Sequence, residues 1–436
     1  MQRLKRTIGI RKIIKMEKMN NGKIVITGMG AVTPIGIGVE EYWKALVEGK
    51  TGVAEIDRFD TTNLPVKIAA MVKDFDEAKY MDKKLAREME PFMQYGYVAA
   101  DEALRDAGID PSSEEPVIAP ERIGIVFGSV FAGITNVADT QEGLTSGEHT
   151  KTNPRFITKI IGNIGAAQIA IAKGLHGPSY TVSTACSSGL DTVSMGAMLI
   201  KEDLADAVIC VGGEAATCPL TILGLSGTHA LSQRNDDPAT ASRPFDAGRN
   251  GFVMGEGGGA IIIEKEEIAK KRNAKIHAEL AGYANSTDGF HVTSPHPEGI
   301  GAIFCMEHSL KTAGLKPEDI DYINAHGTST PKGDVIEVKA IKTLFKDHAY
   351  KLAVSSTKGA TGHLMGAGGV TETIACVKAV EEDILPPTLN QIEKDPECDL
   401  DFVPNESRKS TVNVAMCNAF GFGGQNASLI IKKYNA

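Results

Sequence analysis

Apolar and polar positions change their spacing along the chain in a regular way. Residues 23–36 and 122–129 are short apolar runs rich in β-branched side chains and closed by glycine, which predicts buried strands. Residues 40–50 and 89–107 instead carry apolar side chains at helical spacing, and each stops at a glycine, which predicts helices. Strands that alternate with helices are typical of an α/β protein with buried sheets.

The same alternation continues and starts afresh near residue 275. Further strands are predicted at 180–183, 205–215 and 276–285, further helices at 187–201 and 300–313, and a pair of strands joined by a glycine-rich turn over 411–433. A strand also runs into a polar loop within residues 319–330.

Two segments far apart in the chain share one pattern. VSTACSSGLDTVSMGAM (182–198) and VSSTKGATGHLMGAGGVTETIAC (354–376) both run from a strand through a turn of small residues into a long helix with small residues. We therefore predict two similar halves, residues 23–274 and 275–436.

The charge of the chain is uneven. The net charge is −9, but residues 1–23 hold eight Lys or Arg and only Glu17, so they contribute +7 and the rest carries −16. An acidic body argues against nucleic acid as the main partner. No apolar run approaches the ~20 residues that span a bilayer, so we expect a protein without a membrane anchor, located in the cytoplasm.

The basic segment 1–22 has more than one interpretation. It lacks the long apolar core of a secretion signal and the serines that transit segments favour. We expect a disordered extension, or a start-site artefact with Met16 or Met19 as the true start. The alternative is an organelle transit segment.

The seven cysteines include no CxxC pair, which fits a reducing compartment and gives no zinc signature. Cys186 stands apart, because it lies among small residues where a strand turns into a helix. At the first turn of a helix, unpaired N–H groups and the positive end of the dipole favour a thiolate. A buried apolar role and a nucleophilic role both remain open for it at this point.

Other polar groups fall at similar strand ends. His326 follows a strand in INAHGTSTPKGD, and Lys358 and His363 lie in the turn SSTKGATGHLMGAGG. The two histidines lack compact metal-ligand spacing, which disfavours zinc. GFGGQN, residues 421–426, is predicted to be a hairpin turn or a mobile lid that offers backbone N–H groups.

Several of these motifs occur in a familiar order. TACSSG, NAHGTSTPKGD, TKGATGHLMGAGG and GFGGQN, with ITGMGAVTPIG and ASRPFDAGRNGFVMGEGGG, resemble the elongating β-ketoacyl-acyl carrier protein synthases. The resemblance runs from about Lys23 to the C-terminus and is greatest to the type II synthase of dissociated fatty acid synthesis. It implies the thiolase-like fold, five layers (αβαβα) from two similar halves, and a homodimer.

The resemblance also implies roles for individual residues. Cys186 matches the nucleophile that takes an acyl chain from the carrier, and His326 and His363 match the pair that stabilises the enolate formed when malonyl carrier loses carbon dioxide. Lys358 matches a lysine that supports the electrostatics of the site. The backbone N–H groups of Cys186 and Phe422 match the oxyanion hole. The implied activity is decarboxylative condensation in fatty acid elongation, with no cofactor required for catalysis.

Alternatives stay open beside this activity. A stand-alone polyketide ketosynthase subunit would share the motifs. A thiolase would use coenzyme A thioesters and a second, late cysteine, for which Cys417 is the candidate. A starter-type synthase would carry Asn in place of His363, and a non-catalytic chain-length partner would lack Cys186.

The resemblance further places a carrier-binding patch and a cation. The carrier protein is typically acidic, so a local basic patch is expected to offset the acidic body, formed by Lys84, Arg87 and Lys151.

A monovalent cation site is expected near the catalytic centre. Its candidate ligands are Asn324, Glu372 and Asn418, because oxygen ligands suit a hard cation and Glu372 would otherwise be an unpaired carboxylate in a helix.

One residue departs from the family pattern. In GSVFAGI, residues 128–134, Phe131 aligns with a smaller aliphatic residue of the acyl pocket. A ring there would limit the acyl tail, so we predict a preference for short or medium primers. The alternative is that Phe131 packs at the dimer contact.

Overall fold

The computed structural model describes residues 22–148 and 150–435. The predicted extension, residues 1–22, lies outside this part of the chain except for Gly22. The main strands are β1 (Ile24–Thr33), β5 (Ile123–Gly128), β6 (Ser179–Val182), β7 (Ala207–Glu214), β8 (Gly257–Lys265), β9 (Ala278–Thr287), β10 (Tyr322–Asn324), β11 (Ala353–Ser355), β14 (Val414–Gly421) and β15 (Gln425–Lys433). Shorter strands are β2 (Gly36–Ile37), β3 (Val53–Glu55), β4 (Ile68–Ala70), β12 (Ile384–Leu385) and β13 (Arg408–Lys409).

The α-helices are of two kinds. Those that build the layers are α1 (Val39–Val47), α3 (Pro91–Ala107), α6 (Asn163–Lys173), α7 (Ser188–Lys201), α10 (Ile300–Ala313), α11 (Gly333–Phe345) and α13 (Gly368–Glu382). The others are α2 (Lys83–Glu88), α4 (Ile134–Ser146), α5 (Phe156–Ile160), α8 (Pro219–Ser226), α9 (Glu266–Lys271) and α12 (Lys358–Thr361).

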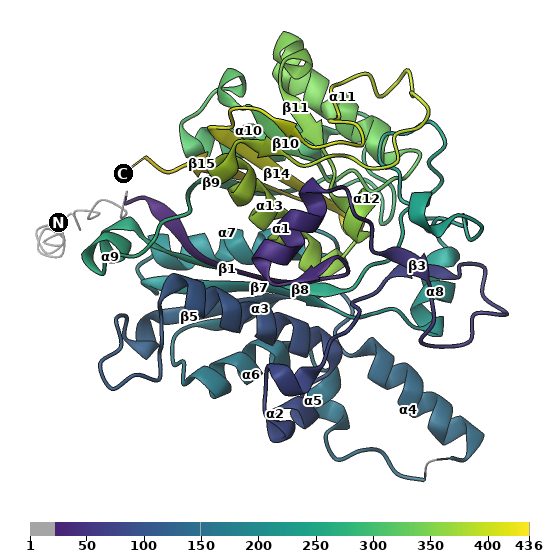
Figure 1. The fold of residues 1–436 in the computed structure, drawn as a ribbon, viewed down its shortest axis with the longest axis vertical. Coiled ribbons are helices and arrows are strands. Elements are labelled where there is room, and N and C mark those ends of the chain that lie inside the picture. The colour runs from purple at the N-terminus through teal and green to yellow at the C-terminus, as the bar shows by residue number, and fades with distance from the viewer. Residues whose placement is uncertain (1–21, 149, 436) are drawn as a thin grey trace, which may run out of the picture.

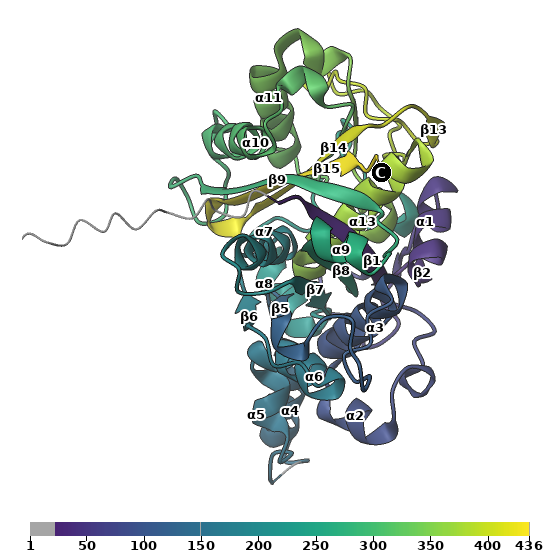
Figure 2. The same ribbon diagram turned by 90° about the vertical axis from the view of Figure 1, so that its left-hand side faces the viewer.

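Helices and sheets stack in five layers, which Figures 1 and 2 show from two sides. α3 and α6 cover the outer face of β1, β8, β7, β5 and β6. α7 and α13 pack on each other between this set of strands and the set formed by β9, β15, β14, β10 and β11, whose outer face carries α10 and α11. The predicted thiolase-like αβαβα arrangement is confirmed.

The two sets of strands have the same topology. In the first, β1 pairs antiparallel with β8, β8 antiparallel with β7, and β7, β5 and β6 run parallel. In the second, β9, β15 and β14 pair antiparallel in that order, and β14, β10 and β11 run parallel. Short pairing of β1 with β9 joins the sets. The boundary predicted at 274/275 falls in the connection between α9 and β9.

The central helices explain the small residues seen in the sequence. Gly189 of α7 faces Gly369 of α13, and a Cβ on Gly189 would lie 2.8 Å from the backbone nitrogen of Gly369. Helices that touch this closely bury their whole circumference, so they carry no strong amphipathic pattern. No helix among the described residues is long and apolar enough to cross a membrane.

Candidate active site

Cys186 lies in the turn between β6 and α7, two residues before the first residue of the helix. It precedes the N-cap, Ser187, so its predicted position at the turn from strand to helix is confirmed. Ala185 has φ of 51°, a strained conformation for a residue with a Cβ. Ser188 holds the turn, because its hydroxyl accepts from the Thr184 backbone N–H at 2.9 Å and donates to the Ala185 carbonyl at 2.6 Å.

Asp191 ties this turn to the second half of the molecule. Its carboxylate accepts from the hydroxyls of Thr184 and Ser187 and from the amide of Asn285 on β9. Burial raises the pKa of Asp191, and these hydrogen bonds oppose the rise. The turn that carries Cys186 is therefore held from both halves.

The end of β14 approaches the same turn. A Cβ on Gly421 would lie 2.9 Å from the Thr184 carbonyl oxygen and 3.0 Å from the Cys186 nitrogen, so only glycine lets the chain pass here. The approach aims the backbone N–H of Phe422 at the Cys186 thiol.

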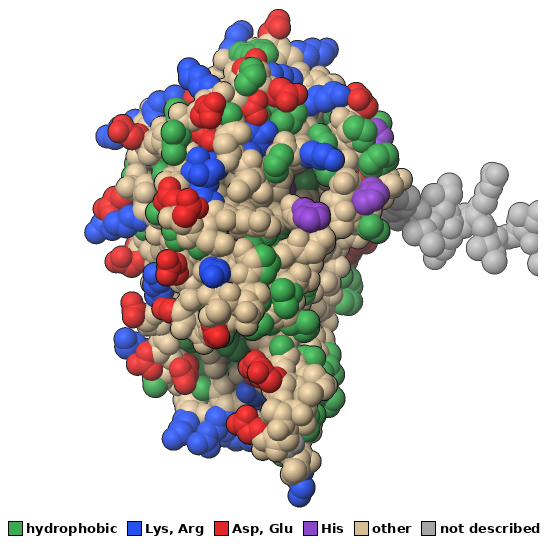
Figure 3. Space-filling view, turned by 90° about the vertical axis from the view of Figure 1, so that its right-hand side faces the viewer, with side chains coloured by type: hydrophobic (Ala, Val, Ile, Leu, Met, Phe, Trp, Pro, Cys, Tyr) green, Lys and Arg blue, Asp and Glu red, His purple; other side chains and the backbone are tan. Residues whose placement is uncertain are grey.

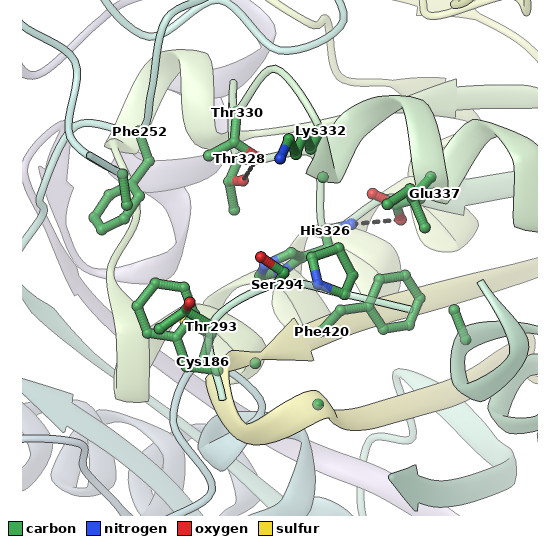
Figure 4. A pocket seen from close by; sticks show the side chains of 18 of the residues that line it. Cys186, Phe252, Thr293, Ser294, His326, Thr328, Thr330, Lys332, Glu337 and Phe420 are labelled. Carbon is green, nitrogen blue, oxygen red and sulfur yellow. Dashed lines mark hydrogen bonds between the residues drawn. The ribbon is translucent and has the colours of Figure 1, made fainter. Parts of the chain in front are cut away.

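His326 lies just beyond β10 and is held through its backbone. Glu337 of α11 accepts from the backbone N–H of His326 at 2.8 Å and of Gly327 at 2.7 Å. Figure 4 shows the bond to His326, with its ring directed towards Cys186. Burial raises the pKa of Glu337 to about 7, while these N–H donors oppose the rise.

The ring of His363 is oriented by its neighbour in the turn. Its Nδ1 lies 3.3 Å from the backbone N–H of Met365, so Nδ1 accepts and the ring proton sits on Nε2. Nε2 is buried and has no hydrogen-bond partner among the described residues. An orphaned N–H of this kind is a donor available to a ligand.

The structure brings the three groups together. The Cys186 sulfur and one ring nitrogen each of His326 and His363 lie within 4.8 Å of one another. They line a cavity of about 360 Å³ that also reaches Phe422, Phe420 and the threonines Thr328 and Thr330.

Burial dominates the charge state of the thiol. It raises the pKa of Cys186 to about 11, although the Phe422 N–H, the Lys358 charge and the Cys186 N–H each lower it. The nearby N–H groups favour the anion as expected, but desolvation of the anion outweighs them.

Both histidines are neutral at physiological pH. Burial lowers the pKa of His326 and of His363 well below its usual range, and the positive charge of Lys358 adds to both shifts. Each neutral ring therefore carries one N–H and one lone pair, and in His363 the lone pair accepts from the Met365 N–H.

Lys358 is buried in an ion pair with Glu372 of α13. Burial raises the pKa of Glu372, and the Lys358 ammonium opposes this. The premise of an unpaired Glu372 carboxylate was therefore wrong.

The other two candidate cation ligands differ from each other. Asn324 Oδ1 is buried without a hydrogen-bond partner among the described residues, which suits a cation. Asn418 Oδ1 already accepts from the Ser428 hydroxyl at 2.9 Å. Asn324 thus keeps a side-chain oxygen free of hydrogen bonds within the described residues, and the cation site stays a prediction.

The trio suits hydrogen bonding to a substrate oxygen better than metal binding. Cys and His are ligands that zinc accepts. However, a metal on His363 Nε2 would force the ring proton onto Nδ1, against the Met365 N–H. The tautomer in the structure instead offers Nε2–H to an oxygen beside a nucleophilic sulfur.

Not every predicted residue lines this cavity. Phe131 is half-buried against an apolar cluster that includes Met365 and Phe252. Lys84 and Arg87 are exposed on α2, and Lys151 is exposed before α5.

The helix that carries Lys84 and Arg87 lies beside α5. Glu88 of α2 pairs with Arg155 at 2.6 Å, and Glu90 pairs with Lys159 of α5 at 2.9 Å, so α2 and α5 are neighbours. Figure 3 shows Lys and Arg side chains gathered at the lower end of the molecule, at the height of α2 in Figure 1.

Sequence reasoning missed the buried carboxylates around the site. Glu337, Asp191 and Glu214 each anchor backbone or hydroxyl donors of a loop or turn that forms it. A single acidic residue in a sequence carries no sign that it is buried, so only the fold could identify them.

Family comparison agrees with this geometry. The family described as Beta-ketoacyl synthase, N-terminal domain, matches residues 21–269, and its C-terminal domain matches residues 277–391. The chain belongs to the β-ketoacyl synthase family. The nucleophile turn and the histidine loops thus fall in the two matched domains of a synthase.

Relatives of this synthase cover nearly its full length. A 3-oxoacyl-[acyl-carrier-protein] synthase 2 of Coxiella burnetii is 45% identical over 95% of this chain and 99% of its own, and one of Synechocystis sp. is 43% identical over 96% and 100%. A solved β-ketoacyl synthase from Burkholderia phymatum has a TM-score of 0.88 and 32% identity, covering 95% of this chain and 100% of that one.

Two further solved ketosynthases are structurally similar as well. The ishigamide ketosynthase/chain length factor gives a TM-score of 0.87 at 33% identity, covering 95% of this chain and 100% of that one. A type II PKS acyl-carrier protein in complex with its ketosynthase gives 0.84 at 29% identity, again covering 95% and 100%.

Cys417 is placed differently from what a thiolase needs. It is fully buried in β14, where burial raises its pKa well above the usual range, and it does not line the cavity. The structure therefore gives no support to a second catalytic thiol at this position.

Proposed function

We propose that the protein condenses an acyl group held on Cys186 with malonyl-acyl carrier protein, in fatty acid chain elongation. The observation that carries this is the trio of Cys186 sulfur and two neutral imidazoles within 4.8 Å, in a synthase of this family. The products are β-ketoacyl carrier protein, carbon dioxide and free carrier. No redox or group-transfer cofactor is needed for this reaction.

The first step loads the enzyme. The Cys186 sulfur attacks the carbonyl carbon of an acyl carrier thioester, the carbon–sulfur bond to the carrier breaks, and the carrier thiol leaves with the cysteine proton. The thiol with raised pKa gives up its proton as the attack proceeds. The backbone N–H groups of Cys186 and Phe422 hold the transient oxyanion, a role commonly worth ~3 kcal/mol per donor.

The second step forms the new carbon–carbon bond. Malonyl carrier loses carbon dioxide, and its electron pair forms an enolate whose oxygen accepts N–H bonds from His326 and His363. The enolate carbon then attacks the acyl carbonyl, and the Cys186 sulfur leaves and regains a proton. Neutral rings suit this step, because they donate without protonating the enolate prematurely. Lys358 contributes positive charge from its pair with Glu372.

An acyl carrier protein is the proposed macromolecular partner. The similar polyketide ketosynthase occurs in complex with an acyl carrier protein. In this chain, Lys84 and Arg87 are exposed on α2, and Lys151 is exposed shortly before Arg155 in the sequence. These three side chains are proposed to form the basic patch.

A second copy of the chain is the other proposed partner. β6 lies at the edge of the sheet and pairs with β5 alone among the described strands. Its residue Tyr180 is exposed, as expected at an uncovered edge. An exposed edge strand is normally covered, and a homodimer would cover it. Sedimentation should give about twice the chain mass of 46.3 kDa; a monomer would contradict the dimer.

A polyketide ketosynthase subunit is the second candidate, favoured by the similarity to the ketosynthase of a type II PKS. It would use the same residues on longer poly-β-keto chains.

Mass spectrometry of partial reactions tests the proposal. With acyl carriers of varied length and malonyl carrier, the wild-type enzyme should give β-ketoacyl products. Cys186→Ala should lose condensation while it keeps malonyl decarboxylation, since only the acyl acceptor is gone. His326→Ala and His363→Ala should lose decarboxylation, while Cys186 is still acylated. Elongation by Cys186→Ala, or full decarboxylation by both histidine variants, would contradict these roles.

A further inference from the structure

The carboxylate of Glu214 lies fully buried at the end of β7. Its hydrogen-bond partners among the described residues are three backbone N–H groups and one hydroxyl, none of them a cation. Its Oε2 accepts from the backbone N–H groups of Val130 at 2.7 Å and of Gly366 at 3.3 Å. Its Oε1 accepts from the Phe131 N–H at 3.2 Å and the Ser129 hydroxyl at 3.3 Å. Two loops distant in sequence therefore converge on one carboxylate.

The first loop carries Phe131. Ser129 accepts from the backbone N–H of Ala132 at 3.1 Å while it donates to Glu214. Ala132 has φ of 46°, which is unfavourable for a residue with a Cβ and persists only where surrounding contacts hold it. Glu214 thus sets the path of the backbone on both sides of the Phe131 ring.

The second loop carries His363. Met365, whose N–H fixes the His363 tautomer, directly precedes Gly366. A Cβ on Gly366 would lie 2.7 Å from the Ser129 Cα and 2.8 Å from Glu214 Oε2, so the two loops touch. A shift at Glu214 would therefore reach the His363 ring through two consecutive residues, Gly366 and Met365.

We propose that Glu214 is a positioning residue that couples the Phe131 loop, which is predicted to bound the acyl pocket, to the His363 turn, so that primer length and enolate stabilisation depend on one carboxylate. The proposal rests on the proposed function, because it assigns Glu214 a part in that reaction.

The energetics favour this role over mere packing. Burial raises the pKa of Glu214 to about 7, against the effect of its four donors. A buried carboxylate without a cation is costly, and a well-packed apolar residue would avoid the cost. The four donors lie on just two loops, and both loops lead to groups with predicted roles in catalysis or specificity.

Glu214→Gln tests the coupling. The glutamine amide replaces one acceptor oxygen with an NH2 donor. In either orientation, this NH2 group faces two donors whose hydrogen bonds the carboxylate oxygen had accepted, so those hydrogen bonds are lost. We expect the ratio of kcat/KM for short over long primers to fall about tenfold, and malonyl decarboxylation to fall about tenfold as well. A purely structural residue would lower Tm and the amount of active enzyme but would leave the primer ratio unchanged.

Glu264→Gln is the matched control. Glu264 is equally buried, on β8, and pairs with Arg272 and Thr27 away from the cavity. It should lose stability without a change in the primer ratio.

Ser129→Ala removes one donor and covers the case in which Glu214→Gln does not fold. It should shift the primer ratio in the same direction by a smaller factor. An unchanged ratio in the folded variants, or an equal change in Glu264→Gln, would overturn the coupling. A wild-type protein that forms no condensation product would overturn the proposed function and the coupling with it.

Discussion

The chemistry of Cys186 depends on a balance between burial and nearby donors. With a pKa of about 11, only about one thiol in ten thousand is ionised at pH 7. In the proposed reaction, the reactive anion would therefore form with the substrate in place, and the carrier thiol would receive the proton. This separates the enzyme from cysteine enzymes that rest as thiolates.

Alkylation measures this directly. The rate of Cys186 reaction with iodoacetamide should rise about tenfold for each pH unit between 7 and 9, because the thiolate fraction rises tenfold while pH stays below the pKa. Cys186→Ala serves as the control for the six other cysteines, which are all buried. A plateau near pH 8 would mean that the donors outweigh burial.

The Phe131 ring is the residue on which primer length is expected to depend. If the acyl tail extends towards it, extra methylenes would overpack the pocket at ~1–3 kcal/mol. Phe131→Ala should therefore raise kcat/KM for long primers about tenfold or more and leave short primers nearly unchanged.

Phe59→Ala provides the comparison, because Phe59 packs against the same apolar cluster as Phe131. It should leave the primer profile as in the wild type. The same profile in Phe131→Ala would leave Phe131 as structural packing.

At the scale of elements, the periodicity of the sequence predicted helices and strands whose pattern lies within a short segment. α10 was predicted at its observed bounds, Ile300–Ala313, and α3 ends before Gly108, which adopts the left-handed conformation at its C-cap. β8 was missed, because its run GGGAIIIEK begins with glycines that discourage a strand. Those glycines are needed: a Cβ on Gly258 would lie 2.4 Å from the Tyr95 backbone.

Only part of the candidate site could be predicted from the sequence, because some of its contacts join elements that are distant in the chain. Cys186, His326 and His363 stand at strand ends in motifs of small residues, so the sequence points to them. Several groups that hold these turns come from distant elements: Glu337 from α11, Asn285 from β9 and Glu372 from α13. Such contacts arise from packing between layers and leave no mark in local spacing.

A buried histidine joins three elements away from the site. His277, just before β9, bonds to Glu381 of α13 at 2.7 Å and to Asp106 of α3 at 2.8 Å. Burial lowers the pKa of His277, but its hydrogen bonds to the two carboxylates outweigh this and raise it. Asp106 also accepts from the Met29 N–H of β1, and the same bridge lowers the pKa of Asp106.

Stability should therefore depend on pH through this bridge. The raised pKa of His277 adds stability that is complete below ~6.5 and is lost as pH rises through the folded value. The lowered pKa of Asp106 adds stability that is present above ~3.9 and is lost at lower pH. His277→Gln should thus cost about 2 kcal/mol of unfolding free energy at pH 5.5 and less at pH 9, measured by denaturant titration.

His176→Gln, at an exposed position, should show no such dependence. An equal loss at both pH values in His277→Gln would mean that the ring contributes packing alone.

At the scale of the whole molecule, two copies of one topology divide the work. The first copy presents the nucleophile between β6 and α7. The second presents Lys358 and His363 at the equivalent point between β11 and α13, and α7 and α13 pack together between the sheets. The duplication thus brings Cys186 and His363 to one cavity from equivalent turns.

The acidic body makes carrier recognition a local matter. Beyond residue 23 the chain carries −16, which repels an acidic carrier at long range. α2 lies at the lower end of the molecule in Figures 1 and 2, and its Lys84 and Arg87 are exposed.

Lys84→Glu with Arg87→Glu should raise KM for carrier substrates about tenfold at low salt and leave kcat nearly unchanged, because docking changes and chemistry does not. The increase should shrink as salt screens the charges. The control variant is Lys311→Glu with Lys316→Glu. Both lysines are exposed near the end of α10, at the opposite end of the molecule. This variant makes the same change in net charge and should alter KM little. If both double variants raise KM equally, net charge alone governs the encounter and α2 is not the docking site; if neither does so at low salt, the carrier binds through contacts other than these charges.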